Sequence, residues 1–172
     1  MGHSGRRLTK GANARSGFWL IPVQDEEGEC RETATEILAS WLNTGRWGMI
    51  ERTRHREHIQ PGDRVCFYVG KVGAIVAHAI VRGPADTPVT SENWPERCPL
   101  PDYRVYEVPL EPLEGLDFRL ERRVPLDRSL RARLEICRGK SIDRYWSWLV
   151  RSPLEISRHD FALLTGQEAK AV

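Results

Sequence analysis

The feature that most constrains this chain is a hydrophobic hairpin punctuated by glycines. It reads IQPGDRVCFYVGKVGAIVAHAIV, with two apolar runs that meet around Gly70 and Gly73. Runs of β-branched and aromatic residues joined by glycines predict two antiparallel strands, over residues 64–69 and 74–81. Both runs are almost continuously apolar, which is typical of a barrel wall or of a sheet covered on both faces.

A long loop follows the hairpin. Residues 83–102 hold five of the eleven prolines of the chain, together with Trp94, so neither a helix nor a strand is expected there. Loops of this length in compact domains usually bind something or are disordered. A binding module is therefore the first hypothesis to test.

The remaining patterns predict strands and helices around this hairpin. Residues 18–23 form a short apolar strand, Thr33 and Glu36 have the spacing of a capping box at a helix start, and 103–110 indicate a further strand. A second capping signal predicts a helix over 158–164. This order favours an α+β domain with a strongly bent sheet or small barrel packed by helices, and the hairpin disfavours parallel βαβ winding.

We expect one domain over residues 18–166, preceded by a disordered basic tail (1–17) and followed by a short tail (167–172). Within the domain, residues 46–58 are polar and rich in Arg, and residues 136–150 show no clean period. Neither stretch receives a secondary-structure assignment.

Charge is distributed unevenly although the net charge is only +2. Residues 1–17 contain four basic residues and no acid, and residues 119–138 contain seven Arg against three acids. Each stretch can contact phosphate or can be an ordinary solvated surface. No apolar run is long enough to cross a bilayer, so we expect no membrane partner.

The cysteines are far apart in the sequence and include no CxxC pair. This spacing, without a signal peptide, favours reduced thiols in a cytoplasmic protein. They stand at Cys30, Cys66, Cys98 and Cys137.

Enzyme signatures are absent from the sequence. It contains no Walker phosphate loop, GxSxG, HExxH or zinc-deaminase pair of motifs. His55 and His58 lack further ligands for a metal and are flanked by Arg. His78 lies within a strand, where a core histidine is more common than a catalytic base. We therefore expect no enzyme activity, metal or cofactor.

Aromatic and basic residues lie on both sides of the hairpin. Trp47 precedes it and Trp94 follows it, and two indoles can close on a planar heterocycle. Each can instead fill one end of a barrel. Trp19 and Trp41 follow strand and helix patterns and are expected in the core. The basic residues suited to phosphates beside Trp47 are Arg46, Arg52, Arg54 and Arg56.

The sequence resembles the EVE domain of the PUA-like superfamily, whose relatives include YTH and ASCH domains. The resemblance rests on the order of FWLIPV, RWGMIERTRHREHIQPGDRVCFYVG, GAIVAHAIVRGPA, the loop with Trp94 and PDYRVYEVPLEPLE, and it covers about residues 18–164. Its most specific part is IQPGDRVCFYVG with the following GAIVAHAIV.

This resemblance implies a PUA-like fold, a small curved β-barrel with mixed or antiparallel strands flanked by helices. It also implies a pocket for one nucleobase, often a modified one, flipped out of its strand. Trp47 and Trp94 occupy the places of the aromatic-cage Trp of YTH relatives. Weaker candidates for contacts to the base edge are Tyr68, Glu51, Arg52 and Thr53, and candidates for contacts to the nucleic-acid backbone are Arg46, Arg54 and Arg56.

The stretch Glu51 to Thr53 departs from the polar Arg-Asn stretch of many EVE domains, which leaves the identity of the base open. Three functions follow as hypotheses. The first is a non-enzymatic reader of 5-methylcytosine-type modified DNA, working with a separate nuclease or effector subunit. The second is an RNA-binding module that recognises modified RNA. The third is a small-molecule sensor or enzyme that uses His78 or Glu51 as an acid or base in the same pocket.

Overall fold

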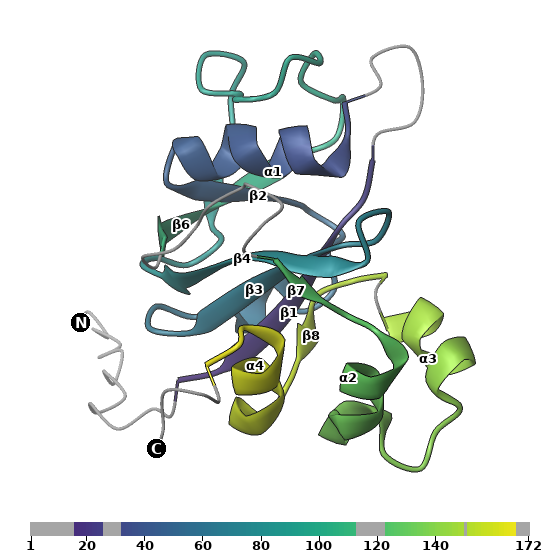
Figure 1. Ribbon diagram of the computed structural model, residues 1–172. Helices are drawn as coiled ribbons and strands as arrows, with labels where there is room; N and C mark the ends of the chain where they lie inside the picture. Colours follow the sequence, from purple (N-terminus) through teal and green to yellow (C-terminus); the bar gives the residue numbers. More distant parts are fainter. Residues whose placement is uncertain (1–15, 26–31, 113–122, 150, 168–172) are drawn as a thin grey trace, which may run out of the picture.

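The computed structural model describes residues 16–25, 32–112, 123–149 and 151–167 (Figure 1). The basic tail predicted at the start of the chain lies outside the described residues as far as residue 15, and so does the end of the chain from residue 168. Most of the domain expected over residues 18–166 falls within the described ranges.

The described elements are short helices and strands. In chain order they are β1 (Phe18–Val23), α1 (Ala34–Asn43), β2 (Arg46–Ile50), the 3-10 turn η1 (Arg56–His58), β3 (Arg64–Val69), β4 (Ala74–Val81), β5 (Thr87–Pro88), β6 (Val105–Pro112), β7 (Val124–Pro125), α2 (Arg128–Arg133), the 3-10 turn η3 (Glu135–Cys137), α3 (Ile142–Leu149), β8 (Leu154–Glu155) and α4 (Arg158–Leu164).

The described strands form one curled, mixed sheet. Its order is β2-β6-β4-β3-β1-β8, with β5 paired to β6 and β7 paired to β4. All of these pairs are antiparallel except β1 with β3, which are parallel from Phe18 opposite Arg64 to Val23 opposite Val69. This mixed sheet agrees with the expected curved barrel of mixed or antiparallel strands. The parallel pair arises because the long connection through α1 and β2 returns the chain in the same direction.

The predicted hairpin is confirmed as β3 and β4. Gly73 has a φ of 65°, which favours glycine, and its N–H donates to the carbonyl of Val69 at 2.8 Å. The register between the two strands shifts between Phe67 and Tyr68. Such irregularities bend a strand and increase its twist, which helps the sheet to curl.

The sheet is buried on both faces. Along β3, Val65, Phe67 and Val69 belong to a cluster packed against α1, while Cys66 and Tyr68 belong to a second cluster. Residues of α3 and α4 complete this second cluster, and Figure 1 shows α1 on one side of the sheet with α2, α3 and α4 on the other. The continuous apolar run of the hairpin is therefore explained by helices on both faces.

Several predicted elements are confirmed near their expected bounds. Helix α1 begins after a complete capping box between Thr33 and Glu36, and α4 has Ser157 as its N-cap. The sequence assigns no element to residues 46–58, yet the first five of them form β2, which pairs with β6. The inward residues of β2 are Trp47 and Met49, and the intervening polar and glycine positions hide this alternation.

The cysteines differ from expectation at one described position. Cys98 is disulfide-bonded. The prediction of reduced thiols was wrong for Cys98, because wide sequence spacing does not reveal proximity in space. Cys66 and Cys137 are free and buried, and burial raises the pKa of both thiols. None of the described helices is long and apolar enough to cross a bilayer.

Candidate functional site

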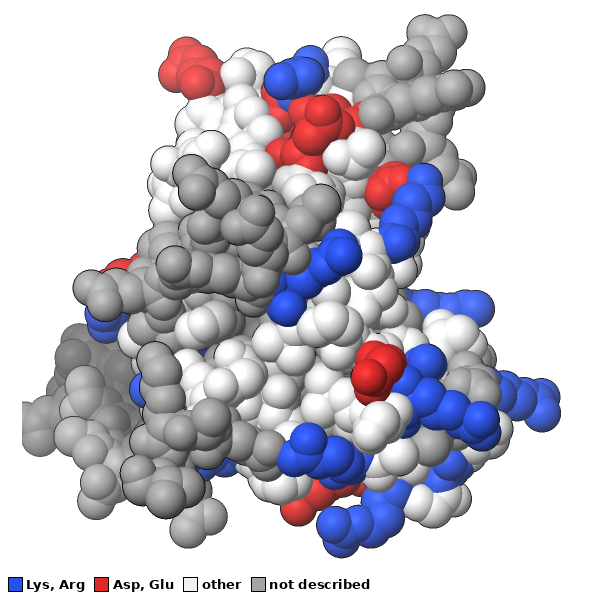
Figure 2. Space-filling model, in the orientation of Figure 1, with Lys and Arg blue, Asp and Glu red and all other residues white. Residues whose placement is uncertain are grey.

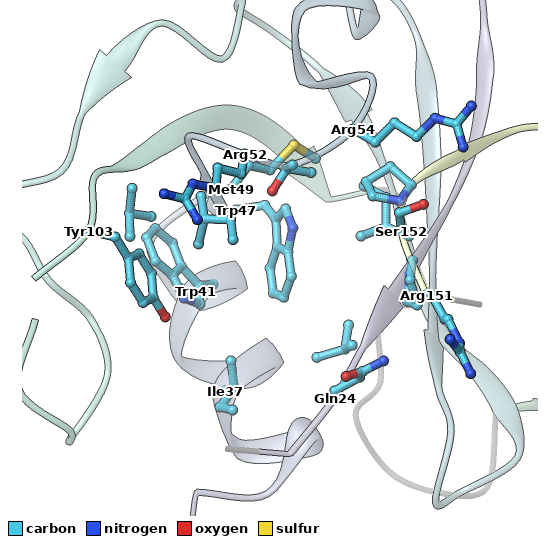
Figure 3. Close-up of a pocket in the computed structure, with 18 of the residues that line it drawn as sticks. Gln24, Ile37, Trp41, Trp47, Met49, Arg52, Arg54, Tyr103, Arg151 and Ser152 are labelled. Carbon is cyan, nitrogen blue, oxygen red and sulfur yellow. The ribbon is translucent and has the colours of Figure 1, made fainter. Parts of the chain in front are cut away.

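A cavity of about 610 Å³ opens between α1, β2 and the end of β1 (Figure 3). Volumes of roughly 300 to 1,000 Å³ are usual for pockets that bind small ligands. Residues from separate stretches of the chain meet around it. The lining residues are Ile21, Pro22, Val23 and Gln24, Ile37 and Trp41, Trp47 to Ile50 with Arg52 to Arg54, Trp94 and Glu96, Tyr103 and Val105, and Arg151 to Pro153.

Three indoles form one aromatic wall of this cavity. The ring centroid of Trp41 lies 6.3 Å from that of Trp47 and 5.4 Å from that of Trp94, and the second contact is edge-on with an interplanar angle of 88°. Trp47 also packs edge-on against Phe67 at 5.1 Å. Trp41 therefore joins the two indoles that the sequence singles out.

A glycine in β2 permits the position of Trp41. A Cβ atom built on Gly48 would lie 2.7 Å from Cη2 and 2.8 Å from Cε2 of the Trp41 indole, and closer still to Cζ2. Trp41 is held from the other side, because its Nε1–H donates to the Glu96 Oε1 atom at 2.5 Å. The indole is thus fixed between the backbone of a strand and the loop after the hairpin.

The proline-rich loop is ordered by its own hydrogen bonds and by Arg46. Trp94 Nε1–H donates to the carbonyl of Cys98 at 2.6 Å. Arg46 forms an ion pair with Glu107 on β6, and its Nη2 group donates to the carbonyl of Asn93 at 3.0 Å. These contacts bring Trp94 back against α1, and Figure 1 shows the loop running past that helix.

The rim of the cavity is basic and polar. Arg52, Arg54 and Arg151 are exposed, and Glu96 is the one acidic residue among the described lining residues. Figure 3 shows Trp41 and Tyr103 on one side, and Gln24, Arg151 and Ser152 on the opposite side. An aromatic wall with amide, hydroxyl and guanidinium groups at its edge can bind a planar ring that carries hydrogen-bonding groups and lies near negative charge.

Several predicted site residues meet at this cavity. Trp47, Trp94, Arg52, Thr53 and Arg54 all line it. Their roles in binding stay predictions, since the structure contains no ligand.

Other predicted residues lie elsewhere. Glu51 is exposed beside the cavity without lining it, and its backbone N–H donates to the carbonyl of Arg104 at 2.9 Å. Tyr68 lies on the opposite face of the sheet, where its ring packs edge-on against Trp146 at 5.4 Å. The alternation of side chains along β3 explains this, because Phe67 takes the face toward the cavity.

Two of the arginines predicted to contact the nucleic-acid backbone instead bind groups within the protein. Arg46 bonds Glu107 and the loop carbonyl of Asn93. Arg56 donates to the carbonyl of Ala85 and stacks on Tyr106, with its Cζ atom 4.1 Å from the ring centroid. Arg54 differs from both, because it is exposed at the cavity rim.

The acid or base considered for an enzyme does not reach the cavity. His78 packs edge-on against Phe161 at 6.3 Å, on the α4 side of the sheet, and neither His78 nor Glu51 lines the cavity.

Sequence reasoning misses several lining residues. The sequence places Trp41 in the core, and it is indeed only 2% exposed, but its ring also forms the centre of the aromatic wall. Its position on the apolar face of α1 gives no sign of this second role. Gln24 follows a strand, and Arg151 and Ser152 lie close to a stretch without a clean period, so only the fold brings them to the cavity.

The sequence matches no protein-family model and no curated protein. The structure, in contrast, is similar to solved structures over nearly its whole length. It resembles Rpa0253 from Rhodopseudomonas palustris, with a TM-score of 0.51, 14% identity and coverage of 91% of this chain and 95% of that one. It also resembles a hypothetical protein from Leishmania major, with a TM-score of 0.53, 12% identity and coverage of 91% and 96%.

A third similar structure has a named ligand. It is the YTH domain of the Zygosaccharomyces rouxii MRB1 protein in complex with N6-methyladenosine RNA, with a TM-score of 0.51, 17% identity and coverage of 95% of this chain and 90% of that one. These similarities show the fold. The chain has a PUA-like fold, as the resemblance to EVE domains implied.

Proposed function

We propose that this protein is a non-enzymatic reader of a modified nucleobase, which it holds in the cavity beside Trp41, Trp47 and Trp94. The observation that carries this proposal is a continuous wall of three indoles in a cavity whose exposed rim carries Arg52, Arg54 and Arg151. Indoles bind flat rings, and guanidinium groups bind phosphate oxygens. A nucleotide combines both chemistries.

The energetics of such binding are favourable. Flipping a base out of its strand costs a few kcal/mol of lost stacking, and one aromatic contact to the base contributes about 1 to 3 kcal/mol to binding. A wall of several indoles can therefore offset the cost. Gln24, Thr53 and Ser152 lie where they can bond the polar edge of the base.

We favour DNA that carries 5-methylcytosine or a related modified base, in line with the resemblance to EVE domains. Ile37 and Met49 line the cavity together with the indoles, so a methyl group on the base would meet apolar surface. A methyl-sized difference in an apolar pocket is worth about 1 to 3 kcal/mol. A separate nuclease or effector subunit would act on the DNA that this protein binds.

A second candidate is a reader of N6-methyladenosine in RNA. The MRB1 YTH domain, which shares the fold, was solved in complex with N6-methyladenosine RNA. The aromatic wall suits this base as well, because stacking does not depend on which base is bound.

Binding measurements on matched oligonucleotides test the proposal. Fluorescence anisotropy would compare DNA strands that differ only in cytosine against 5-methylcytosine, and RNA strands that differ only in adenosine against N6-methyladenosine. We expect the methylated DNA to bind about tenfold more tightly than its unmodified match. A preference for the methylated RNA alone would support the second candidate, and equal binding to every strand would overturn both.

A pair of Trp variants tests whether the preference for the methylated strand arises in the cavity. Trp47 and Trp146 are both buried, at 8% and 5% exposure, but lie in clusters on opposite faces of the sheet. Trp47→Phe should reduce the preference for the methylated strand, whereas Trp146→Phe should leave it unchanged. Equal behaviour of the two variants would contradict binding in this cavity.

A further inference from the structure

The geometry points to a second nucleic-acid contact on the opposite side of the sheet. We infer that α2, the turn after it and α3 bind the phosphodiester backbone of the strand whose base enters the cavity. This inference rests on the proposed function, and it concerns residues outside the cavity.

Positive charge is concentrated on this face. Between residues 123 and 144 the chain has seven basic residues against three acidic ones, although its net charge is only +2. Figure 2 shows the basic side chains gathered at the lower right, the region of α2 and α3 in Figure 1. The basic residues of this face are Arg123, Arg128, Arg131, Arg133, Arg138, Lys140 and Arg144.

Three of these side chains are well suited to an external anion. Arg128, Arg138 and Arg144 are exposed, and none of them belongs to an ion pair within the part of the chain that the structure describes. Four ion pairs of the described residues lie on other elements of the fold, and they join Arg46 to Glu107, Arg56 to Glu57, Lys71 to Asp25 and Arg82 to Glu111. The guanidinium groups of these three residues face solvent.

The face is held rigidly to the domain. Asp160 on α4 is fully buried and accepts from the backbone N–H groups of Glu135 at 2.7 Å and Ile136 at 3.1 Å. Leu134 and Trp146 are buried in the cluster beneath, and α2 is in contact with α3. Anchoring of this kind lowers the entropy lost when a strand binds.

The basic face also adjoins the cavity along the chain. Helix α3 ends at Leu149, and Arg151 to Pro153 then form one wall of the cavity before β8 begins. A strand with one base in the cavity can therefore continue past Arg151 toward α3.

The composition of the face favours a phosphodiester backbone over a membrane. Six of its seven basic residues are Arg, whose planar group forms paired hydrogen bonds with phosphate oxygens. Membrane-binding faces combine basic residues with large apolar side chains, so binding to anionic vesicles is measured beside binding to oligonucleotides.

The test compares two double variants with the same change in charge. Arg128→Gln with Arg144→Gln alters the basic face, whereas Lys71→Gln with Arg82→Gln removes two exposed charges, one in the turn between β3 and β4 and one just after β4. Affinity for short single-stranded DNA and RNA would be measured against salt concentration. Each phosphate contact contributes about 0.7 to the slope of log affinity against log salt, so losing two should reduce the slope by about 1.4.

The first variant should bind modified and unmodified strands more weakly by the same factor, and the control should keep the wild-type slope. An unchanged slope in the first variant, or an equal decrease in the control, would overturn the inference. Binding to vesicles with anionic lipid but to no oligonucleotide would also overturn it. The proposed reader function is judged separately, by the ratio of affinities for modified and unmodified strands.

Discussion

Gly48→Ala should disturb the aromatic wall of the cavity. The added methyl group would lie 2.7 Å from Cη2 and 2.8 Å from Cε2 of Trp41. Favourable contacts between carbon atoms begin at about 3.5 Å, so the indole or the strand must move by about 1 Å.

The surroundings of Trp41 leave little room for this movement. The ring is 2% exposed, contacts Trp47 and Trp94, and donates to Glu96 at 2.5 Å. Overpacking a core typically costs about 1 to 3 kcal/mol, and a lost hydrogen bond adds about 1 kcal/mol. We therefore expect Gly48→Ala to lower the free energy of unfolding by about 2 to 4 kcal/mol.

Urea denaturation would measure this loss, and near-ultraviolet circular dichroism would report the displaced indole. Gly70→Ala is the matched control, because the nearest atom to its added Cβ is 3.9 Å away, on Tyr68. The control should change stability by less than about 1 kcal/mol. If Gly48→Ala were as stable as the control and kept the wild-type spectrum, the close approach of strand and indole would be refuted.

Two further predictions concern carboxyl groups. Asp160→Ala leaves the backbone N–H groups of Glu135 and Ile136 without their acceptor, so urea denaturation should show a loss of about 2 to 4 kcal/mol, and a loss below about 1 kcal/mol would contradict the anchoring role. Hydrogen bonds from the backbone and hydroxyl of Thr33 lower the pKa of Glu36, so its contribution to stability is present above the usual pKa of a Glu and is lost as the pH falls through the lowered pKa. Glu36→Gln should therefore lose less stability on acidification than the wild type, and identical pH profiles would argue against the capping box.

The elements with strong local signals could be predicted from the sequence. The hairpin, the capping box at Thr33 and the helix over 158–164 each depend on neighbouring residues, and all three are present. Strand β2 was missed because Arg46 and Gly48 break an apolar pattern that only Trp47 and Met49 maintain.

The cavity could be predicted only in part. Trp47 and Trp94 flank the hairpin in the sequence, and both line the cavity. The contact of both with Trp41 requires the packing of α1 against β2 and the return of the loop through Arg46. Tyr68 was expected on the cavity side because sequence alone does not say which face of β3 turns toward α1.

The most direct test of the central claim is an NMR experiment on the complex. An oligonucleotide with a ¹³C-labelled methyl group on its modified base would be bound to the protein, and intermolecular contacts of that methyl group would be recorded. We predict contacts to the indole protons of Trp41 or Trp47, with the methyl resonance shifted upfield by the rings. A bound oligonucleotide whose methyl group shows no contact to any indole of the cavity would contradict the claim.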